Sequence, residues 1–247
     1  MACVRLRLVQ RSAHNIDLAS FLHWYVMVEI HDPTYAKRFY ITYEILEDYI
    51  LKYKPEGRED DDGAKMWQGL VCQTELIAQL CTIMKDVKTV RGTQRKIERL
   101  RQLLAGLMSE LMYFEEPIPL HLDPKVLITG IIPAESSLFK SALHPLRLTF
   151  KTADGGKYKV MFKKGDDIRQ DQLVIQMVSL MDRLLKLENL DLQLTSYKVL
   201  ATGHEEGMIE FIPSNSLAQI LSEHRSLVNY LQQYHPDENG PFGITAT

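Results

Sequence analysis

The chain has 247 residues, of which 45% are hydrophobic and 25% charged, a composition typical of a globular protein with one or two cores. Its net charge of -3 gives no overall attraction for nucleic acid. No stretch approaches the roughly eighteen consecutive apolar residues of a membrane span. Three cysteines without paired spacing favour reduced thiols in a cytosolic protein over disulfides or a metal site.

The first part of the sequence carries the patterns of α-helices. Asn15 is a suitable N-cap for a mostly apolar segment that ends near Ile30, and residues 35–51 repeat apolar side chains at the spacing of one helix face. A longer helical region covers residues 66–112 and is interrupted near Arg91. The N-terminal residues lack the apolar run of a signal peptide, so we do not expect one.

A basic cluster lies between the two apolar stripes of that longer region. It consists of Arg91, Arg95, Lys96, Arg99 and Arg101. Such a cluster is typical of a solvated helix face, which is the interpretation that we favour, and contact with an acidic membrane surface is the alternative.

The pattern changes at Glu115. Residues 115–124 contain three prolines and no helical period, which predicts an extended connector and a domain boundary. We therefore divide the chain into residues 1–115, which are helical, and residues 116–247, which begin with β-structure.

The second part carries strand patterns followed by a helix. Two strands are joined around Asp154-Gly155-Gly156, the strongest hairpin signal in the chain. Pro213 ends the last strand, and Ser214 or Ser216 is expected to cap a helix. The expected strands are residues 125–132, 146–151, 157–163, 190–201 and 208–212, and the expected final helix is residues 217–234.

The most informative stretch covers residues 157–180. Large side chains alternate along a strand that ends at Lys163, a glycine turn and an acidic loop follow, and then a helix with apolar residues at helical spacing begins. Lys163 and Asp171 lie on either side of the turn, so we expect the two side chains to meet. A lysine held by a carboxylate in this way is suited to point at a phosphate.

At these residues the sequence resembles a known family. FKKGDDIRQDQL (residues 162–173) resembles the FK-x-GDD-[LI]-RQD signature of the phosphatidylinositol 3- and 4-kinases. Three further segments are similar to the class III phosphatidylinositol 3-kinases, in the same order along the chain. They are GIIPAESSLFKSALHP (130–145), LENLDLQLTSYKVLAT (187–202) and DENGPFGI (237–244).

The resemblance implies an α+β fold with two parts. Residues 1–115 correspond to the end of the solenoid-like helical accessory (PIK) domain with its linker helices, so the chain is expected to begin inside a helical array. Residues 116–247 correspond to the N-lobe of the kinase domain, an antiparallel sheet plus a helix, followed by the hinge and the first helix of the C-lobe.

The resemblance also implies an ATP site. A loop over the phosphates is expected to contain Ser136, Ser137, Phe139, Lys140 and Ser141, although without the resemblance this segment reads as a surface turn. Lys163 is expected to contact the phosphates, oriented by Asp171, although a lone strand-end lysine is ordinarily solvated.

The rest of this expected site surrounds the adenine. Tyr197 is expected to line the back of the pocket, with a core tyrosine as the equal alternative. Met161 and Ile209 are expected to form apolar walls. Backbone groups of the hinge would pair with the adenine edge; the hinge residues are Glu210, Phe211 and Ile212.

The sequence contains neither the family's catalytic loop (DRH-x-x-N) nor its metal-binding DFG. The resemblance implies an intact kinase that uses ATP and Mg²⁺ or Mn²⁺ to phosphorylate phosphatidylinositol on its 3-hydroxyl, in endosomal or vacuolar trafficking and autophagy. We expect this chain alone to be inactive, because it lacks the base and the metal ligands.

The implied partners are a phosphatidylinositol-containing membrane, a regulatory protein-kinase-like subunit and a beclin-type coiled-coil subunit, with no nucleic acid. The implied location is cytoplasmic and peripheral on endosomal, vacuolar or autophagosomal membranes. Two alternatives stay open: a non-catalytic interaction module of the lipid-kinase complex, and a piece of a phosphatidylinositol 4-kinase or a related protein kinase.

Overall fold

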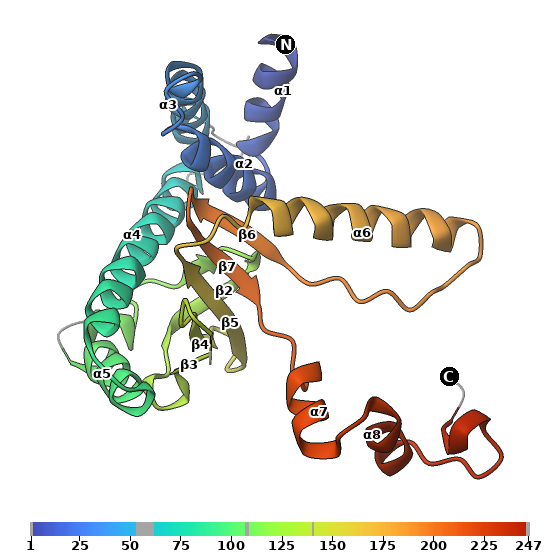
Figure 1. Ribbon diagram of the computed structural model, residues 1–247. Coiled ribbons are helices and arrows are strands. Elements are labelled where there is room, and N and C mark those ends of the chain that lie inside the picture. Colours follow the sequence, from blue (N-terminus) through green and yellow to red (C-terminus); the bar gives the residue numbers. More distant parts are fainter. Residues whose placement is uncertain (1, 53–61, 107–108, 140, 246–247) are drawn as a thin grey trace. The chain divides into compact units, whose positions relative to one another are not determined.

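The computed structural model describes residues 2–52, 62–106, 109–139 and 141–245 (Figure 1). The chain forms two compact units, Met1–Phe211 and Ile212–Thr247, which are described separately below. No helix among the described residues combines the length and the apolarity needed to cross a bilayer.

The first unit begins with the expected helical region. Asn15 caps the second helix by accepting a hydrogen bond from the Leu18 N–H at 3.0 Å. The expected interruption near Arg91 is present, and Gly92 has a positive φ of 90° there. The helices are α1 (Ala2–Ser12), α2 (Ile16–Glu29), α3 (Ala36–Lys52), α4 (Asp62–Thr89) and α5 (Thr93–Ala105), with a short 3-10 turn, η1 (Ser109–Leu111), after them.

An antiparallel sheet follows, so the expected α+β class is confirmed. Its strand order is β1-β2-β4-β5-β7-β6, with β3 paired to β4. The short edge strand β1 lies in the segment that the sequence predicted as a connector. The strands are β1 (Ile118–Leu120), β2 (Asp123–Ile131), β3 (Ser137–Leu138), β4 (Leu146–Thr152), β5 (Lys157–Lys164), β6 (Val199–Gly203) and β7 (Glu206–Glu210), and η2 (Pro133–Glu135) precedes β3.

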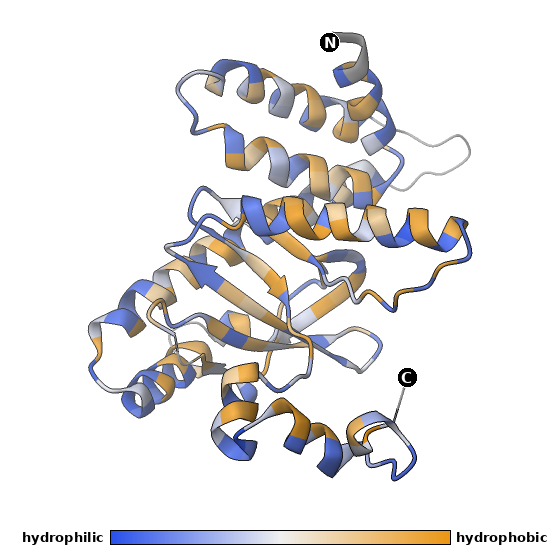
Figure 2. Cartoon of the chain, turned by 45° about the vertical axis from the view of Figure 1, so that its right-hand side comes forward, coloured by the Kyte–Doolittle hydropathy of each residue, from blue (hydrophilic) through white to orange (hydrophobic). Residues whose placement is uncertain are grey.

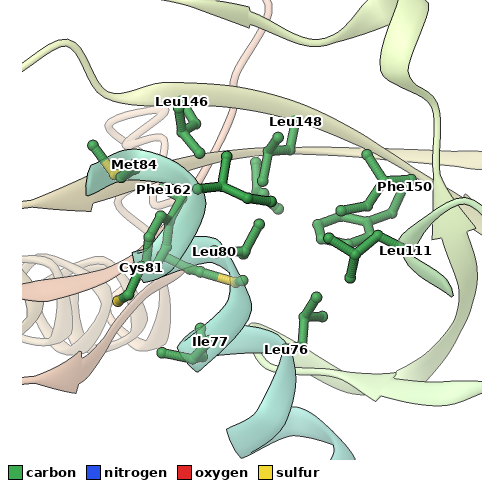
Figure 3. Packing of buried hydrophobic residues seen from close by; sticks show 14 of the residues in the cluster. Leu76, Ile77, Leu80, Cys81, Met84, Leu111, Leu146, Leu148, Phe150 and Phe162 are labelled. Carbon is green, nitrogen blue, oxygen red and sulfur yellow. The ribbon is translucent and has the colours of Figure 1, made fainter. Parts of the chain in front are cut away.

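One face of the sheet forms the main core together with α4 and α5. Val160 and Phe162 lie on one side of β5, as the alternation along the strand predicted, and both are fully buried. Figure 3 shows Phe162 and Phe150 of the sheet beside Leu80 and Met84 of α4. Because this face is covered by helices, only the opposite face of β5 is available for a ligand.

A buried hydrogen-bond network joins the helices to the start of the sheet. The Gln73 side chain accepts from Trp24 Nε1 at 2.9 Å and from the Ser20 hydroxyl at 3.2 Å, and it donates to the Pro119 carbonyl at 2.7 Å. His121 Nε2 lies 2.9 Å from the Gln73 carbonyl oxygen. Residues on both sides of position 115 therefore share one core.

The helix α6 (Arg169–Leu187) contains no fully buried residue, and polar side chains make its hydrogen bonds to the rest of its unit. Gln172 accepts from the Ala201 N–H at 2.8 Å, and Gln176 donates to the Tyr25 hydroxyl at 2.9 Å. The hydrophobic residues along α6 (Figure 2) are largely exposed. They are Leu173, Val174, Met177, Leu180, Met181, Leu184 and Leu187.

This arrangement predicts unequal costs for two substitutions near α6. Ile168 is buried against Val28 and Ala201, so Ile168→Ala should lower the free energy of unfolding by about 2–4 kcal/mol. Leu184 is 53% exposed, so Leu184→Ser should change it by less than about 0.5 kcal/mol. Urea unfolding of both variants measures this, and a large loss for Leu184→Ser would show that the apolar side of α6 is covered.

The structure corrects two further sequence expectations in the first unit. A strand was expected over residues 190–201, but the regular strand begins only at Val199. Asn189 and Gln193 have positive φ values of 60° and 53°, which an extended ladder does not allow. The returning strand, β7, covers Glu206–Glu210 instead of residues 208–212.

The second unit contains α7 (Leu217–His224), α8 (Leu227–Tyr234) and η3 (Pro241–Gly243). A single helix was expected over residues 217–234. Arg225 adopts a left-handed conformation with φ 65° and ends α7, and Ser226 caps α8 by accepting from the Asn229 N–H. Of the two serines considered as the first cap, Ser216 is the one that accepts from Gln219.

Candidate nucleotide-binding site

The strand register places several expected site residues in one row across the sheet. Ser137 pairs with Arg147, Arg147 with Met161, and Met161 with Ile209. Directly opposed residues of antiparallel strands point to the same side. The neighbouring Phe162 is buried on the helix-covered side, so this row lies on the opposite face of the sheet.

An aromatic contact joins the expected phosphate loop to the end of β7. The rings of Phe139 and Phe211 are 5.9 Å apart between centroids, and the Arg147 guanidinium lies 5.8 Å from the Phe211 ring. The Phe139 N–H also donates to the Pro145 carbonyl at 3.0 Å. The structure therefore brings the loop and the hinge segment together at the end of the row.

The serines of the expected loop differ in their availability to a ligand. Ser136 is fully buried, and its hydroxyl donates to the Ile132 carbonyl at 3.0 Å, so direct phosphate contact by this side chain is not supported. Ser137 is half-buried on β3, and Ser141 is exposed. Lys140 lies outside the described residues.

Lys163 has a different carboxylate partner from the one expected. It forms an ion pair with Asp166, three residues along the chain. Asp171 is exposed on the first turn of α6 and forms no ion pair with Lys163 among the described residues. The reason is the turn: Gly165, with φ 96°, returns the chain so that Asp166 lies at the strand end.

Arg169 fixes the rest of the acidic loop through ion pairs. Arg169 donates to Asp167 at 2.7 Å and also pairs with Glu29 of α2 at 3.1 Å. The hydrogen bond from Arg169 lowers the pKa of Asp167 to about 2. This loop therefore keeps its charge pairing throughout the neutral pH range.

The neighbouring Lys164 is held by residues that the sequence did not identify. It forms an ion pair with Glu206 of β7, and its Nζ lies 3.4 Å from Cys81 Sγ of α4. Burial lowers the Lys164 pKa, but the pairing with Glu206 outweighs it and the pKa is raised overall. Burial, followed by the contact with Glu206, raises the pKa of Cys81 to about 11. Lys164 thus stabilises the strand, and Lys163 lies on the ligand face.

The hinge residues have fewer free backbone donors than expected. The Glu210 N–H donates to the Lys198 carbonyl at 2.8 Å, and the Phe211 N–H donates to the Lys159 carbonyl at 3.1 Å. The Ile212 N–H has no partner among the described residues. Ile212 is the first residue of the second unit.

Tyr197 is not brought to the row. It lies before β6, in a segment without a strand partner, and lines an open cavity of about 560 Å³. Phe21 and Tyr25 of α2 and Gln176 of α6 line the same cavity. Val199, two residues later, both lines this cavity and pairs with Ile209.

Comparison with known proteins identifies the relatives of this chain. Residues 157–241 match the family model described as phosphatidylinositol 3- and 4-kinase. A phosphatidylinositol 3-kinase of Glycine max, the root isoform, is 70% identical over 241 residues, which is 97% of this chain and 30% of that protein. The phosphatidylinositol 3-kinase VPS34 of Arabidopsis thaliana is 69% identical over 248 residues, covering 100% of this chain and 30% of the relative.

More distant relatives have the same description. The phosphatidylinositol 3-kinase VPS34 of Saccharomyces cerevisiae is 41% identical over 237 residues, covering 96% of this chain and 25% of the relative. The chain thus spans 30% or less of the length of these curated relatives. The resemblance that the sequence motifs indicated is confirmed along nearly the whole chain.

Proposed function

We propose, from the membership of this chain in the class III phosphatidylinositol 3-kinase family, that it forms the ATP-binding small lobe of such a kinase. In this proposal residues 1–115 are the end of the helical accessory domain, and residues 116–247 are the N-lobe, the hinge and the start of the C-lobe. The two parts share one core, so we expect residues 1–211 to fold as one unit.

The observation that carries the proposal is the row of Ser137, Met161 and Ile209 on the face of the sheet opposite α4 and α5. Lys163 lies on the same face of β5, because it is two residues beyond Met161. Apolar side chains beside a cation at the strand end suit a nucleotide, whose base is apolar on its faces and whose phosphates are anionic.

The proposed pose follows from this geometry and from the family resemblance. The adenine would lie against Met161 and Ile209, with Phe139 near it and its edge at the backbone of Glu210, Phe211 and Ile212. Tyr197 would lie farther back in the pocket. The phosphates would lie at Lys163, below a loop formed by Ser136, Ser137, Lys140 and Ser141, with Ser136 contributing backbone only.

Two details adjust the roles of the charged groups. Asp166 pairs with Lys163, so a bound phosphate would compete for part of this contact. The bound divalent ion supplies further charge neutralisation in kinases of this kind, and no residue of this chain is proposed as its ligand.

For the intact protein we propose transfer of the γ-phosphoryl group of ATP, with Mg²⁺ or Mn²⁺, to the 3-hydroxyl of phosphatidylinositol, on endosomal, vacuolar or autophagosomal membranes. Its partners would include a regulatory protein-kinase-like subunit and a beclin-type coiled-coil subunit. This chain alone should show no turnover, because its sequence contains no DRH-x-x-N or DFG segment. ATP-dependent lipid product from the purified chain would contradict this expectation.

The test of the proposed site is nucleotide binding by the purified 247-residue chain. Lys163→Ala should weaken binding of ATP at least about tenfold, because it removes the cation expected at the phosphates. Lys159→Ala is the matched control, since Lys159 is exposed on the same face of β5, four residues earlier, and it should leave the affinity nearly unchanged.

Titration of a fluorescent ATP analogue gives both affinities. Equal binding by the Lys163→Ala variant and the wild type would contradict the role of Lys163. No binding by the wild type, with the fold intact by circular dichroism, would favour the alternative of a non-catalytic interaction module.

A further inference from the structure

The junction between α4 and α5 carries a local excess of positive charge. Residues 85–101 contain seven basic and two acidic residues, in a chain whose net charge is -3. We call this surface the basic corner. Its basic residues are Lys85, Lys88, Arg91, Arg95, Lys96, Arg99 and Arg101.

Most of this charge is not neutralised within the protein. Arg99 alone has a carboxylate partner among the residues described, and it donates to both oxygens of Asp86, at 2.7 and 2.9 Å. Lys88 and Arg101 donate to carbonyl oxygens, at 3.2 and 3.1 Å. These contacts order the two side chains but do not neutralise their positive charges. Most of these side chains are exposed, so the positive charge is presented to solvent.

Those two carbonyl contacts place the basic corner beside the candidate site. Arg101 donates to Ser136, the first residue of the expected phosphate loop, and Lys88 donates to Lys164, the neighbour of Lys163. In Figure 1, α5 lies next to the strand β3, with which it is in contact.

We propose that the basic corner binds the anionic surface of a phospholipid bilayer. The cations are spread over a helix end, a turn and a second helix, which suits a diffuse negative surface. A phosphorylated or acidic peptide is bound typically by arginine forks that converge on one point, and the fork of Arg99 is already used by Asp86.

Nucleic acid fits this surface less well. Residues 85–101 contain no aromatic side chain on which bases could stack. The proposal depends on the charges of this chain and not on nucleotide binding, so its test is independent of that for Lys163.

The test is flotation of the purified chain with vesicles. Wild-type protein should bind vesicles of phosphatidylcholine and phosphatidylserine, should not bind phosphatidylcholine alone, and should be released as salt is raised. The combined substitution Arg91→Glu, Arg95→Glu and Lys96→Glu should weaken binding at least about tenfold.

The matched control carries the same change in net charge at another surface. Lys37→Glu, Arg38→Glu and Lys65→Glu alter three exposed residues of α3 and α4 away from the corner, and should reduce binding less than about threefold. Three results would overturn the proposal: equal losses in both variants, equal binding to neutral vesicles, or capture by immobilised polyglutamate with no binding to the anionic vesicles. Unchanged ATP affinity in the corner variant would support two separate surfaces.

Discussion

Acidification from pH 7 to pH 4 should destabilise this chain by about 3 kcal/mol for each of two buried histidines. His121 is fully buried, and burial lowers its pKa from 6.5 to about 4. His23 is also buried, and burial together with the nearby His121 lowers its pKa from 6.5 to about 4. The folded chain therefore favours neutral imidazoles at both positions.

The direction of the effect follows from these pKa values. Below pH 6.5 the unfolded chain binds protons at both histidines, whereas the folded chain does not bind them until about pH 4. The stabilisation is fully present above pH 6.5, decreases as the pH falls from 6.5 to 4, and does not decrease further through these groups below that range.

Urea unfolding at several pH values between 7 and 4 measures this dependence. His121→Gln should reduce the slope of the free energy of unfolding against pH by about one proton in this interval. His204→Gln, at an exposed histidine, is the control for the substitution itself. A slope that His121→Gln does not alter would contradict burial of a neutral imidazole at this position.

Gln73→Leu should lower the free energy of unfolding by about 3–5 kcal/mol. The side chain of Gln73 is fully buried and bonds with Trp24, Ser20 and the Pro119 carbonyl. Leucine has a similar size but no polar atoms, so it leaves these buried groups without partners. Because Pro119 belongs to the sheet and Trp24 to α2, the substitution should also loosen the helices from the sheet.

Chemical denaturation followed by tryptophan fluorescence is the measurement, since Trp24 is one of the groups affected. Gln68→Leu on the exposed side of the same helix is the control and should change stability by less than about 0.5 kcal/mol. If both substitutions had the same small effect, the network would not contribute to the connection between α2, α4 and β1.

Much of the site could be expected from short sequence patterns. The alternation along residues 157–163 predicts a strand, and β5 (Lys157–Lys164) confirms it. The Asp154-Gly155-Gly156 hairpin is also present, with Gly155 at a positive φ of 83°. Such features depend on neighbours within a few residues, so they can be recognised without knowing the tertiary structure.

Other parts of the site depended on long-range packing. The sequence suggested that Lys163 and Asp171 are partners. The conformation at Gly165 instead places Asp166 in contact with Lys163. Burial of Ser136 follows from contacts with distant elements, including the Arg101 side chain of α5. Tyr197 was expected on a strand, but the regular strand begins two residues later, at Val199.

The sequence by itself determined most of the helices and strands, the hairpin, the cap at Asn15 and the family of this chain, since each depends on residues that are close along the chain. Only the tertiary structure decided which carboxylate holds Lys163, which side of α6 is exposed, and that Gln73 joins helices to sheet. The physical reason is that ion pairs, burial and hydrogen bonds between distant residues depend on strand register and helix packing, which local patterns do not specify.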